Sequence, residues 1–386
     1  MGGEGARNYG AFLEIEPRGT RSPERKNRST RANNRSAGFS DPRVGCTYIH
    51  GLEGRRRPSA GDRVSNTYRF PGIPFGWYTI AESKDVQRGQ VETVKYFGEE
   101  LILYRTESGE ARLTGAYCPH LGAHLGRGKV AGENLQCAFH GFQFDGDGRC
   151  VHAYGKSVPR KAKLDTWAIR EHNGFIFAWY HPEGAAPSFE IPVLPGPEAG
   201  WTAFKTETRA IASHPQETSE NSVDVGHFSK LHTFSEAWYE GDLAVEGPIL
   251  RGKYGLKYPL PFDISIKASF DVAVYGLGYS LVKITPSVGP EMHLLVLSSP
   301  VDNGNIVLRT SLAVRHGPVK PFTYLVRLAA YLAISNEISQ DAPIWESKRY
   351  LDRPLLAEGD GPIGEYRRYC KQFYVDTQPT TGRQDK

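Results

Sequence analysis

Two pairs of residues between positions 118 and 140 each combine a cysteine with a histidine, side chains that can bind metals. Cys118 and His120 form one pair, and Cys137 and His140 form a second pair after sixteen intervening residues. Thiolate sulfur suits zinc or iron–sulfur clusters, and imidazole suits zinc or iron. A structural zinc site usually takes its cysteines as one block and its histidines as another. Each pair here mixes the two, so the spacing favours an iron–sulfur cluster, with zinc as the alternative.

The mixed pairs correspond to one particular kind of cluster. In a Rieske centre, two cysteines hold one iron of a 2Fe–2S cluster and two histidines hold the other iron. Gly122 and Gly141 leave the tips of both loops without bulky side chains, so backbone amides can approach the cluster sulfurs. The sequence therefore predicts a Rieske cluster held by these two cysteines and two histidines.

A second group of polar residues follows about eighty positions later. Asn221, Asp224 and His227 recur in steps of three, which predicts that they share one side of a helix. His232 follows after a turn loosened by Gly226. Two histidines and one carboxylate form the facial triad of mononuclear non-haem iron, which leaves positions open for dioxygen and substrate. The two histidines are the predicted iron ligands, the third ligand must come from elsewhere, and a structural histidine pair is the alternative.

The first half of the sequence has the pattern of an antiparallel β-sheet domain. Short β-branched and aromatic runs are separated by turn residues, and an Asp-Gly-Asp-Gly turn at 145–148 follows the second ligand pair. The expected strands are 77–80, 91–97, 101–104, 166–170 and 175–180. Such a sheet would present the cluster ligands on two loops at one end.

The second half predicts a curved antiparallel sheet wrapped against a long helix. The expected strands lie within 264–284, 294–298 and 306–315, the last two joined by an Asn-Gly turn. A helix follows, and its apolar residues, interpreted as the face toward the sheet, are Phe322, Leu325, Leu328 and Leu332. A space between sheet and helix is a usual place for a hydrophobic ligand, although an ordinary core would explain most of these side chains. The predicted fold class is α+β, an all-β Rieske domain followed by a helix-grip domain.

Composition divides the chain of 386 residues into five parts. Residues 1–68 are predicted to be disordered, because they contain too little apolar surface to fold alone. Their basic excess accounts for the positive charge of the whole chain, so the charge balance does not indicate nucleic-acid binding. The alternatives for this segment are a tail that binds nucleic acid or anionic lipid, an organelle transit peptide, and a start codon assigned too early. The expected parts after it are a Rieske domain over 69–183, a proline-rich linker over 184–200, a catalytic domain over 201–375 and a flexible tail over 376–386.

Cysteine usage and hydropathy limit the compartment. The five cysteines, two of them in the cluster loops, are too few and odd in number for a disulfide scaffold, which predicts a reducing, cytoplasmic location. The longest helix-like apolar run, 325–334, is interrupted by Arg327 and is too short to cross a bilayer, so we expect no membrane span.

Both groups of candidate ligands resemble the motifs of Rieske oxygenases. The loops at 118–122 and 137–144 are similar to the cluster loops of that family. Quinol-oxidising Rieske proteins carry an additional cysteine pair that forms a disulfide, and Ala123 and Phe139 stand at the corresponding positions here. Ala138 replaces a proline that is common in the family and that binds no metal.

The second group is similar to the iron motif of the same family. The residues that match its acidic position, its aspartate and its two histidines are Glu220, Asp224, His227 and His232. The resemblance implies that Asp224 contacts His140 of a neighbouring subunit in a head-to-tail homotrimer. Asn221 matches a residue near the iron.

The resemblance also implies the third iron ligand. The carboxylate ligand of the family lies on the C-terminal helix, where Asp341 is the candidate and Glu337 and Glu346 are its rivals. Pro343 should bend this helix and can turn Asp341 inward. The stretch 352–374 resembles one branch of the family, which contains ketosteroid 9α-hydroxylase oxygenases and cholesterol 7-desaturases.

The implied activity is that of the terminal oxygenase of a multicomponent monooxygenase, which uses dioxygen to hydroxylate or desaturate a steroid- or sterol-like substrate. The implied cofactors are one 2Fe–2S cluster and one mononuclear Fe(II) per subunit. No glycine-rich dinucleotide motif follows an expected strand, so we expect no bound NAD or flavin. Electrons should then come from a separate NAD(P)H-dependent flavin and iron–sulfur reductase, directly or through a ferredoxin.

Two other functions stay open. One is a Rieske electron carrier whose second domain binds a hydrophobic ligand. The other is an aromatic-acid demethylase or ring-hydroxylating oxygenase, which would need a cation in its pocket. The candidate cations are Lys205, Arg209, Lys267 and Lys283.

Overall fold

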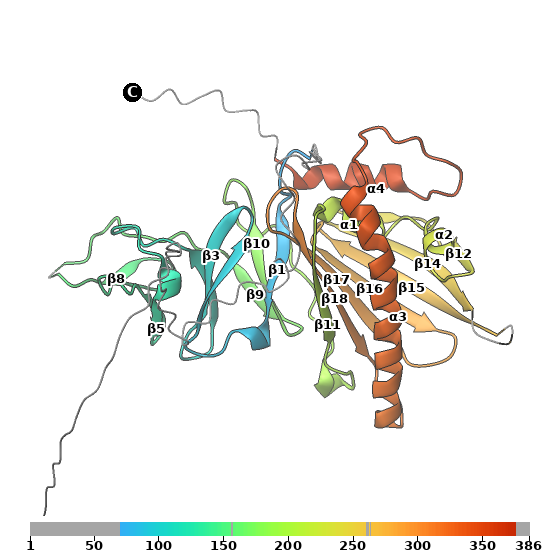
Figure 1. Ribbon diagram of the computed structural model, residues 1–386, viewed down its shortest axis with the longest axis horizontal. Coiled ribbons are helices and arrows are strands. Elements are labelled where there is room, and N and C mark those ends of the chain that lie inside the picture. The colour runs from blue at the N-terminus through green and yellow to red at the C-terminus, as the bar shows by residue number, and fades with distance from the viewer. Residues whose placement is uncertain (1–69, 156, 260–261, 263, 376–386) are drawn as a thin grey trace, which may run out of the picture. The chain divides into compact units, whose positions relative to one another are not determined.

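The computed structural model describes residues 70–155, 157–259, 262 and 264–375 (Figure 1). The disorder expected for 1–68 and the flexible tail expected for 376–386 fall outside these residues. None of the helices in the described part of the chain has the length and apolar character needed to cross a membrane.

The first half is built from antiparallel strands in three small sheets, as the runs of β-branched and aromatic residues predict. The first sheet contains, in spatial order, β1 (Gly76–Glu82), β10 (Phe175–Tyr180) and β9 (Ile169–His172). The second contains β2 (Val91–Tyr96), β3 (Glu99–Arg105) and β4 (Ala111–Gly115). The third contains β5 (Lys129–Ala131), β6 (Asn134–Gln136), β7 (Gln143–Phe144) and β8 (Cys150–His152). The strand expected over 166–170 is therefore displaced toward the C-terminus, to β9.

The turn at 145–148 closes the β7–β8 hairpin, as expected. Gly148 donates its N–H to the carbonyl of Asp145 (3.0 Å) and has a φ of +78°, which suits a glycine. The Asp145 carboxylate accepts the backbone N–H groups of Asp147 (3.0 Å) and Arg149 (2.8 Å). Side-chain capping of this kind fixes the turn immediately after the second ligand loop.

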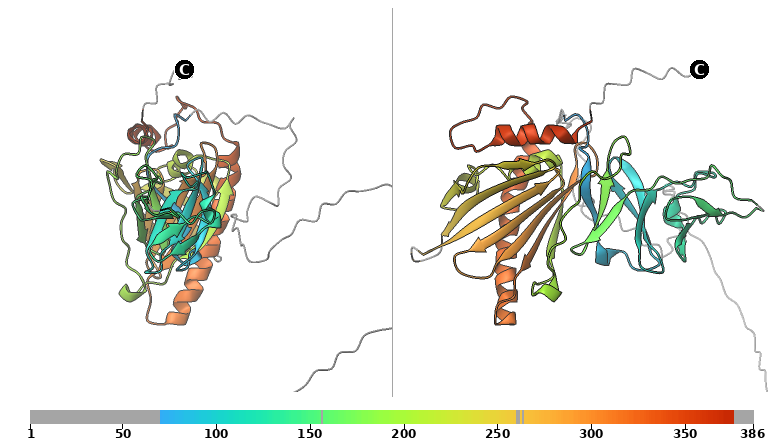
Figure 2. Two further views of the ribbon diagram at one scale, coloured as in Figure 1. Left: turned by 90° about the vertical axis from the view of Figure 1, so that its left-hand side faces the viewer. Right: turned by 180° about the vertical axis from the view of Figure 1, so that it is seen from behind.

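The second half is dominated by one eight-stranded antiparallel sheet. Its strands, in spatial order, are β11 (Lys205–Ile211), β18 (Ile306–Val314), β17 (Met292–Pro300), β16 (Tyr279–Pro286), β15 (Ser265–Tyr275), β14 (Ile249–Pro259) and β12 (Glu236–Tyr239), with β13 (Ala244–Glu246) also paired to β14. Figures 1 and 2 show the 28-residue helix α3 (Lys320–Ser347) lying across one face of this sheet. The α+β fold, a β domain followed by a sheet wrapped on a long helix, is confirmed.

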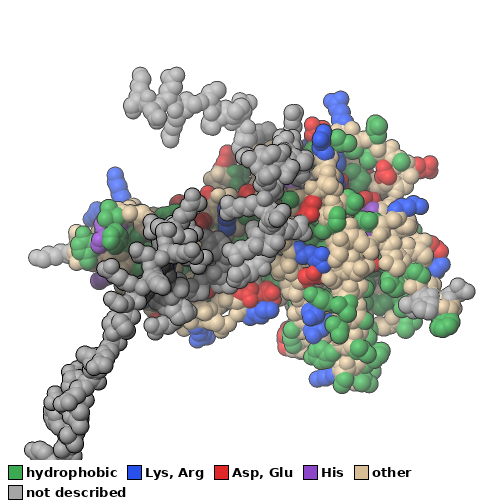
Figure 3. Space-filling model, viewed as in Figure 1, with side chains coloured by type: hydrophobic (Ala, Val, Ile, Leu, Met, Phe, Trp, Pro, Cys, Tyr) green, Lys and Arg blue, Asp and Glu red, His purple; other side chains and the backbone are tan. Residues whose placement is uncertain are grey.

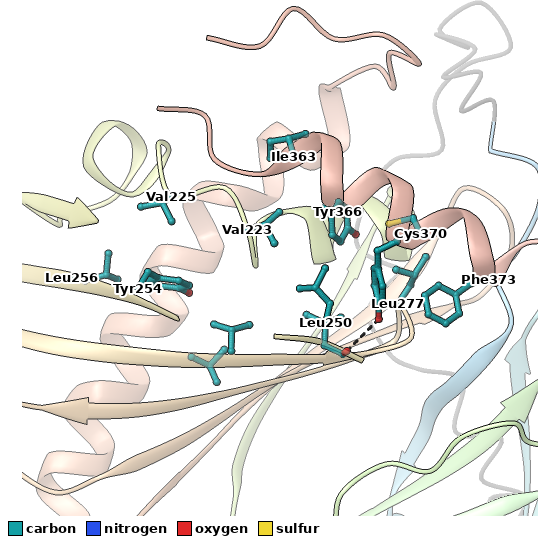
Figure 4. Packing of buried hydrophobic residues seen from close by; sticks show 14 of the residues in the cluster. Val223, Val225, Leu250, Tyr254, Leu256, Leu277, Ile363, Tyr366, Cys370 and Phe373 are labelled. Carbon is teal, nitrogen blue, oxygen red and sulfur yellow. Dashed lines mark hydrogen bonds between the residues drawn. The ribbon is translucent and has the colours of Figure 1, made fainter. Parts of the chain in front are cut away.

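Three shorter helices complete the second half. They are α1 (Pro215–Glu220), α2 (Phe228–Leu231) and α4 (Ile363–Cys370). Single 3-10 turns are η1 (Ser83–Asp85), η2 (Leu125–Arg127), η3 (Pro197–Ala199) and η4 (Lys371–Phe373). In Figure 4, α4 packs Tyr366 over the same buried cluster that contains Val223, Val225 and Leu250. The two valines thereby anchor the segment between α1 and α2, which carries Asp224.

The single helix expected through Asn221, Asp224 and His227 is wrong. Helix α1 ends at Glu220, and its last turn closes where Asp224 donates its N–H to the Glu220 carbonyl (3.2 Å). The Asp224 carboxylate then accepts the N–H of His227 (3.3 Å). Serine, valine, aspartate and glycine are weak helix formers, and a short acidic side chain bonded to the backbone competes with helix formation.

Of the apolar stripe expected on the inner face of α3, Phe322 borders the cavity, whereas its three leucines lie on the outer face of the helix. Phe322, Leu325, Leu328 and Leu332 are 61%, 61%, 45% and 58% exposed. The residues of α3 that line the cavity against the sheet include Val326, Ala329, Ala330, Ala333 and Ile334. Because this part of α3 is apolar on both sides, its spacing identifies a helix but not the side that packs.

Candidate metal centres and substrate cavity

The two cysteine–histidine loops have matching backbone geometry. In the first loop, the N–H of Gly122 donates to the carbonyl of Cys118 (2.9 Å), and in the second the N–H of Gly141 donates to that of Cys137 (3.1 Å). The two glycines have φ values of +71° and +70°, a conformation that favours glycine. The fold thus presents two equivalent turns, each with its cysteine at the base.

These loops bring two sulfurs and two imidazoles together. Cys118 and Cys137 are buried and free, and the ring centroids of His120 and His140 lie 4.8 Å apart. Burial, together with the neighbouring Cys137, raises the pKa of Cys118 to about 11. A thiolate at this position therefore needs a bound cation. The donor set fits a 2Fe–2S cluster, in which the two thiolates would hold one iron and the two imidazoles the other.

Exposed apolar side chains surround the two histidines. Phe139 is 63% exposed and Tyr154 is 73% exposed. The ring of His120 stacks on Phe142 at 4.4 Å. The histidine edge of the cluster site therefore lies on a surface that is suited to contact with another protein.

The second group assembles from distant parts of the chain. The ligand atoms of His227, His232 and Asp341 all lie within 4.8 Å of one another. The histidines flank α2, and Asp341 is buried on α3. His227 Nδ1 is buried without a hydrogen-bond partner, and Asp224 Oδ2 lies 3.5 Å from it. Two imidazoles and one carboxylate are a donor set that fits a divalent iron.

The rival carboxylates take different positions. Glu346 is not a member of the group that could hold a metal, whereas Glu337 Oε2 lies 2.8 Å from His232 Nδ1. Asp341 Oδ1 lies 3.4 Å from the opposite nitrogen, Nε2. The structure therefore brings Asp341 to the metal side of His232 and Glu337 to its back.

Gln340 is a residue of this site that the sequence did not suggest. Its Oε1 lies 3.1 Å from His232 Nδ1 and can accept the N–H of that nitrogen, while Glu337 Oε2, although closer, has no hydrogen-bond geometry. A proton held on Nδ1 leaves Nε2 free to bind a metal. The signal in the sequence is the spacing of Glu337, Gln340 and Asp341, three and four residues apart on one helix face.

Asp224 and Asn221 lie beside the triad. Burial would raise the pKa of Asp224, but the hydrogen bonds and charge of His227 lower it below its usual value. Asn221 lines the cavity described below, and its Oδ1 accepts the indole N–H of Trp345 (3.4 Å). Both residues named from the sequence are therefore next to the candidate iron ligands.

A buried ion network joins the segments that carry the triad. Glu220 accepts a hydrogen bond from Arg367 Nε of α4 (2.9 Å) and another from Lys348 Nζ (3.2 Å). Lys348 is the residue that directly follows α3. Lys348 Nζ also lies 2.5 Å from Glu217 Oε2, whose side chain is fully buried. Glu220, known from the sequence only as a motif position, thus ties α1 to the end of α3 and to α4.

A cavity of about 650 Å³ ends at the triad and is lined mainly by apolar side chains. Among the described residues, no Lys or Arg lines it. The four candidate cations, Lys205, Arg209, Lys267 and Lys283, are all outside the lining. Lys205 instead lies over the Tyr331 ring (4.5 Å), and Arg209 pairs with Glu207. The cavity therefore suits an uncharged, hydrophobic molecule.

Two family models match the chain. The Rieske [2Fe-2S] domain matches residues 76–167, and the 3-ketosteroid 9alpha-hydroxylase C-terminal domain matches residues 178–374. Cholesterol 7-desaturase nvd 1 from Ciona intestinalis is 31% identical over 84% of this chain and 73% of its own length. The 3-ketosteroid-9-alpha-monooxygenase oxygenase component from Rhodococcus rhodochrous is 30% identical over 83% of this chain and 88% of its own length.

Solved structures share the fold. NdmA of Pseudomonas putida CBB5, solved with caffeine, superposes with a TM-score of 0.61 at 19% identity, covering 76% of this chain and 89% of NdmA. Dicamba monooxygenase bound to dicamba also gives 0.61, at 18% identity, covering 77% of this chain and 96% of its own. The chain therefore belongs to the Rieske oxygenases that carry a 3-ketosteroid 9alpha-hydroxylase C-terminal domain.

Proposed function

We propose that this enzyme is the terminal oxygenase component of a multicomponent monooxygenase and that it hydroxylates or desaturates a steroid- or sterol-like substrate. The observation that carries the proposal is the apolar cavity of about 650 Å³ that ends at His227, His232 and Asp341. The relatives named as ketosteroid monooxygenases and cholesterol desaturases support the substrate class. The lack of a lining Lys or Arg among the described residues disfavours an aromatic acid.

The proposed ligands divide between two metal centres. Cys118, His120, Cys137 and His140 would hold the 2Fe–2S cluster, and His227, His232 and Asp341 would hold a mononuclear iron. When bound, these centres supply electrons and the activation of dioxygen. A function as an electron carrier alone would leave the triad unexplained, because an electron carrier has no need for a second metal site at the end of a cavity.

The residues around the triad have separate roles in this proposal. The hydrogen bond to Gln340 fixes the ring of His232, so that Nε2 points to the metal side, and the carboxylate of Glu337 adds a negative charge behind the ring. Apolar walls exclude water from the substrate and orient it by shape rather than by charge. Asn221 is held by Trp345 at the cavity wall, where its amide can contact a substrate or dioxygen.

The proposal includes a homotrimer in which Asp224 of one chain bonds to His140 of the next. The exposed Phe139 and Tyr154 beside the cluster histidines support a protein contact at this point. It also includes a separate NAD(P)H-dependent reductase, supported by the description of the bacterial relatives as oxygenase components. We also propose a cytoplasmic location, which is supported by the four unpaired cysteines among the described residues. The domain boundaries at 69–183, 184–200 and 201–375 belong to the same proposal.

The test is oxygen consumption coupled to product formation. The holoenzyme with a surrogate reductase is given 3-ketosteroids, cholesterol and aromatic acids in parallel, and products are identified by mass spectrometry. We expect a hydroxylated or desaturated product from at least one steroid, with one dioxygen consumed per product. Turnover of an aromatic acid, with steroids yielding only hydrogen peroxide, would reject the substrate class.

A further inference from the structure

The N-terminal half of α3 is apolar on two opposite sides. One side lines the cavity through Val326, Ala330 and Ala333. The other side exposes Leu325 (61%) and Leu328 (45%). A helix that is hydrophobic all round is normally enclosed by apolar surroundings on every side. Here only the cavity side is enclosed.

This exposed stripe continues to the mouth of the cavity. Phe322 and Val288 both line the cavity, yet they are 61% and 75% exposed, so they mark its opening. Phe322 precedes Asp341 by nineteen residues on α3, which is about 28 Å along the helix. Val319 beside the opening is 60% exposed. Figure 3 shows hydrophobic side chains gathered over the lower end of α3, where the helix begins.

The charge of this region suits a membrane surface. Between Lys320 and Asn336 the helix carries two basic residues, Lys320 and Arg327, and no acidic residue. The first acidic side chain is Glu337, at the triad end. Apolar side chains flanked by cations are the composition of helices that lie in the lipid headgroup region.

The position of the stripe favours lipid over a second protein. A protein that covered the stripe as far as Phe322 and Val288 would lie across the cavity mouth and obstruct it. A bilayer would not obstruct the mouth, because a hydrophobic substrate dissolves in the lipid and can pass from it directly into the cavity.

We propose that the outer face of α3, from Val319 to Leu332, together with Val288 lies on the surface of a lipid bilayer. The apolar side chains enter the headgroup region and place the cavity mouth against the lipid. The passage of substrate from lipid rests on the proposed function, whereas binding to lipid does not.

The experiment is flotation of the full-length holoenzyme with neutral phosphatidylcholine vesicles. Neutral lipid removes electrostatic attraction of the basic segment 1–68 as a cause of binding. The variant L325E/L328E places two charges on the stripe without altering a side chain that lines the cavity. The matched control, V193E/L355E, adds the same charges at exposed sites (71% and 100%) outside the stripe.

We expect the wild type and the control to float, and the partition coefficient of L325E/L328E to fall by at least about tenfold. Cluster absorption and melting temperature check that each variant folds, and L325Q/L328Q replaces the charged variant if it does not. Equal flotation of the stripe variant, or a wild type that stays with the unbound fraction, would overturn the proposal. Loss of an oligomer in the stripe variant, without flotation of the wild type, would assign the stripe to contacts between copies instead.

A second measurement separates this proposal from the proposed function. Turnover is compared for a 3-ketosteroid supplied in the same vesicles and in cyclodextrin. The stripe variant should lose turnover only with vesicles. Flotation of the wild type without turnover of any steroid would retain the membrane contact and reject the substrate class.

Discussion

At the residue scale, His232 lies between two carboxylates of α3 that have different positions relative to its ring. Asp341 is 3.4 Å from Nε2, and Glu337 is 2.8 Å from Nδ1. Burial lowers the pKa of His232, while Asp341, Gln340 and Glu337 raise it above its usual value. The surplus of negative charge around one imidazole is what a divalent cation would neutralise.

Replacing Asp341 with alanine should remove the mononuclear iron alone. We expect the D341A protein to retain the cluster spectrum and its reduction by a reductase, to lose about one iron of three per chain, and to lose product formation by at least about a hundredfold. Metal analysis and product assays measure these changes. The matched control is E346A, five residues along the same helix, which should keep all three irons. Full activity of D341A would refute the ligand assignment.

Replacing Glu337 with glutamine should weaken iron binding without removing the site. The charge behind the His232 ring is lost, while Gln340 still holds Nδ1, so we expect iron affinity to fall about tenfold. Chelator competition, monitored by the electron paramagnetic resonance signal of the nitric oxide adduct, measures the affinity. An unchanged affinity in E337Q, with E346Q as the reference, would show that Glu337 does not tune the site.

At the element scale, the short helix α1 depends on a buried histidine. His214 caps α1 by accepting the N–H of Gln216 on Nδ1 (3.2 Å), and its ring stacks on Phe70 at 3.9 Å. Burial lowers its pKa to about 3. The ring must therefore stay neutral for α1 to keep its N-terminal cap and to hold the segment that carries Asp224 and His227.

This cap predicts a pH dependence of stability. The pKa of His214 is lower in the folded protein than in the unfolded chain, so the unfolded chain binds a proton first as the pH falls. The free energy of unfolding therefore decreases as pH falls from about 6.5 toward 3. Between pH 7 and pH 5 this costs about 2 kcal/mol. In H214N, whose amide can cap a helix without titrating, the loss over this interval should be smaller by that amount, measured by urea denaturation. An identical pH profile in the variant would exclude His214 as the cause.

At the scale of the whole molecule, the proposed trimer places each cluster and the iron to which it passes electrons on different chains. If Asp224 contacts His140 of the next chain, a subunit that lacks its own cluster can receive electrons from the cluster of a neighbour that lacks mononuclear iron. The half-buried cluster histidines, with the exposed Phe139 and Tyr154 beside them, are consistent with such a pairing. A heterologous contact of this kind forms a closed ring when the rotation between subunits closes.

Co-expression of two inactive variants tests this arrangement. C118S lacks the cluster and D341A lacks the mononuclear iron, so each alone should be inactive. In randomly mixed trimers, roughly a quarter of the sites would pair an intact iron with an intact neighbouring cluster, and activity should recover to that extent. Adding D224A to the C118S chain should abolish the recovery. No recovery in mixed trimers would indicate transfer within one chain.

The sequence by itself determined the α+β fold and the presence of a Rieske domain, and it predicted the ligands in the cluster loops and the two histidines of the candidate iron site. These features depend on short spacings, because each loop holds its ligands within a few residues and each strand follows a local alternation. Cys118, His120 and Gly122, for example, form one turn whose geometry needs no distant partner.

The tertiary structure decided what depends on packing between distant segments. In the tertiary structure, Asp341 rather than Glu346 lies beside the two histidines. The helix expected through 221–227 ends at Glu220, and Leu325 and Leu328 are exposed to solvent. Which side of a helix packs depends on the surface opposite it, and a helix that is apolar on both sides gives no local signal for that choice. The same reason explains why the pairing of Glu220 with Arg367, 147 residues away, could not be predicted from spacing.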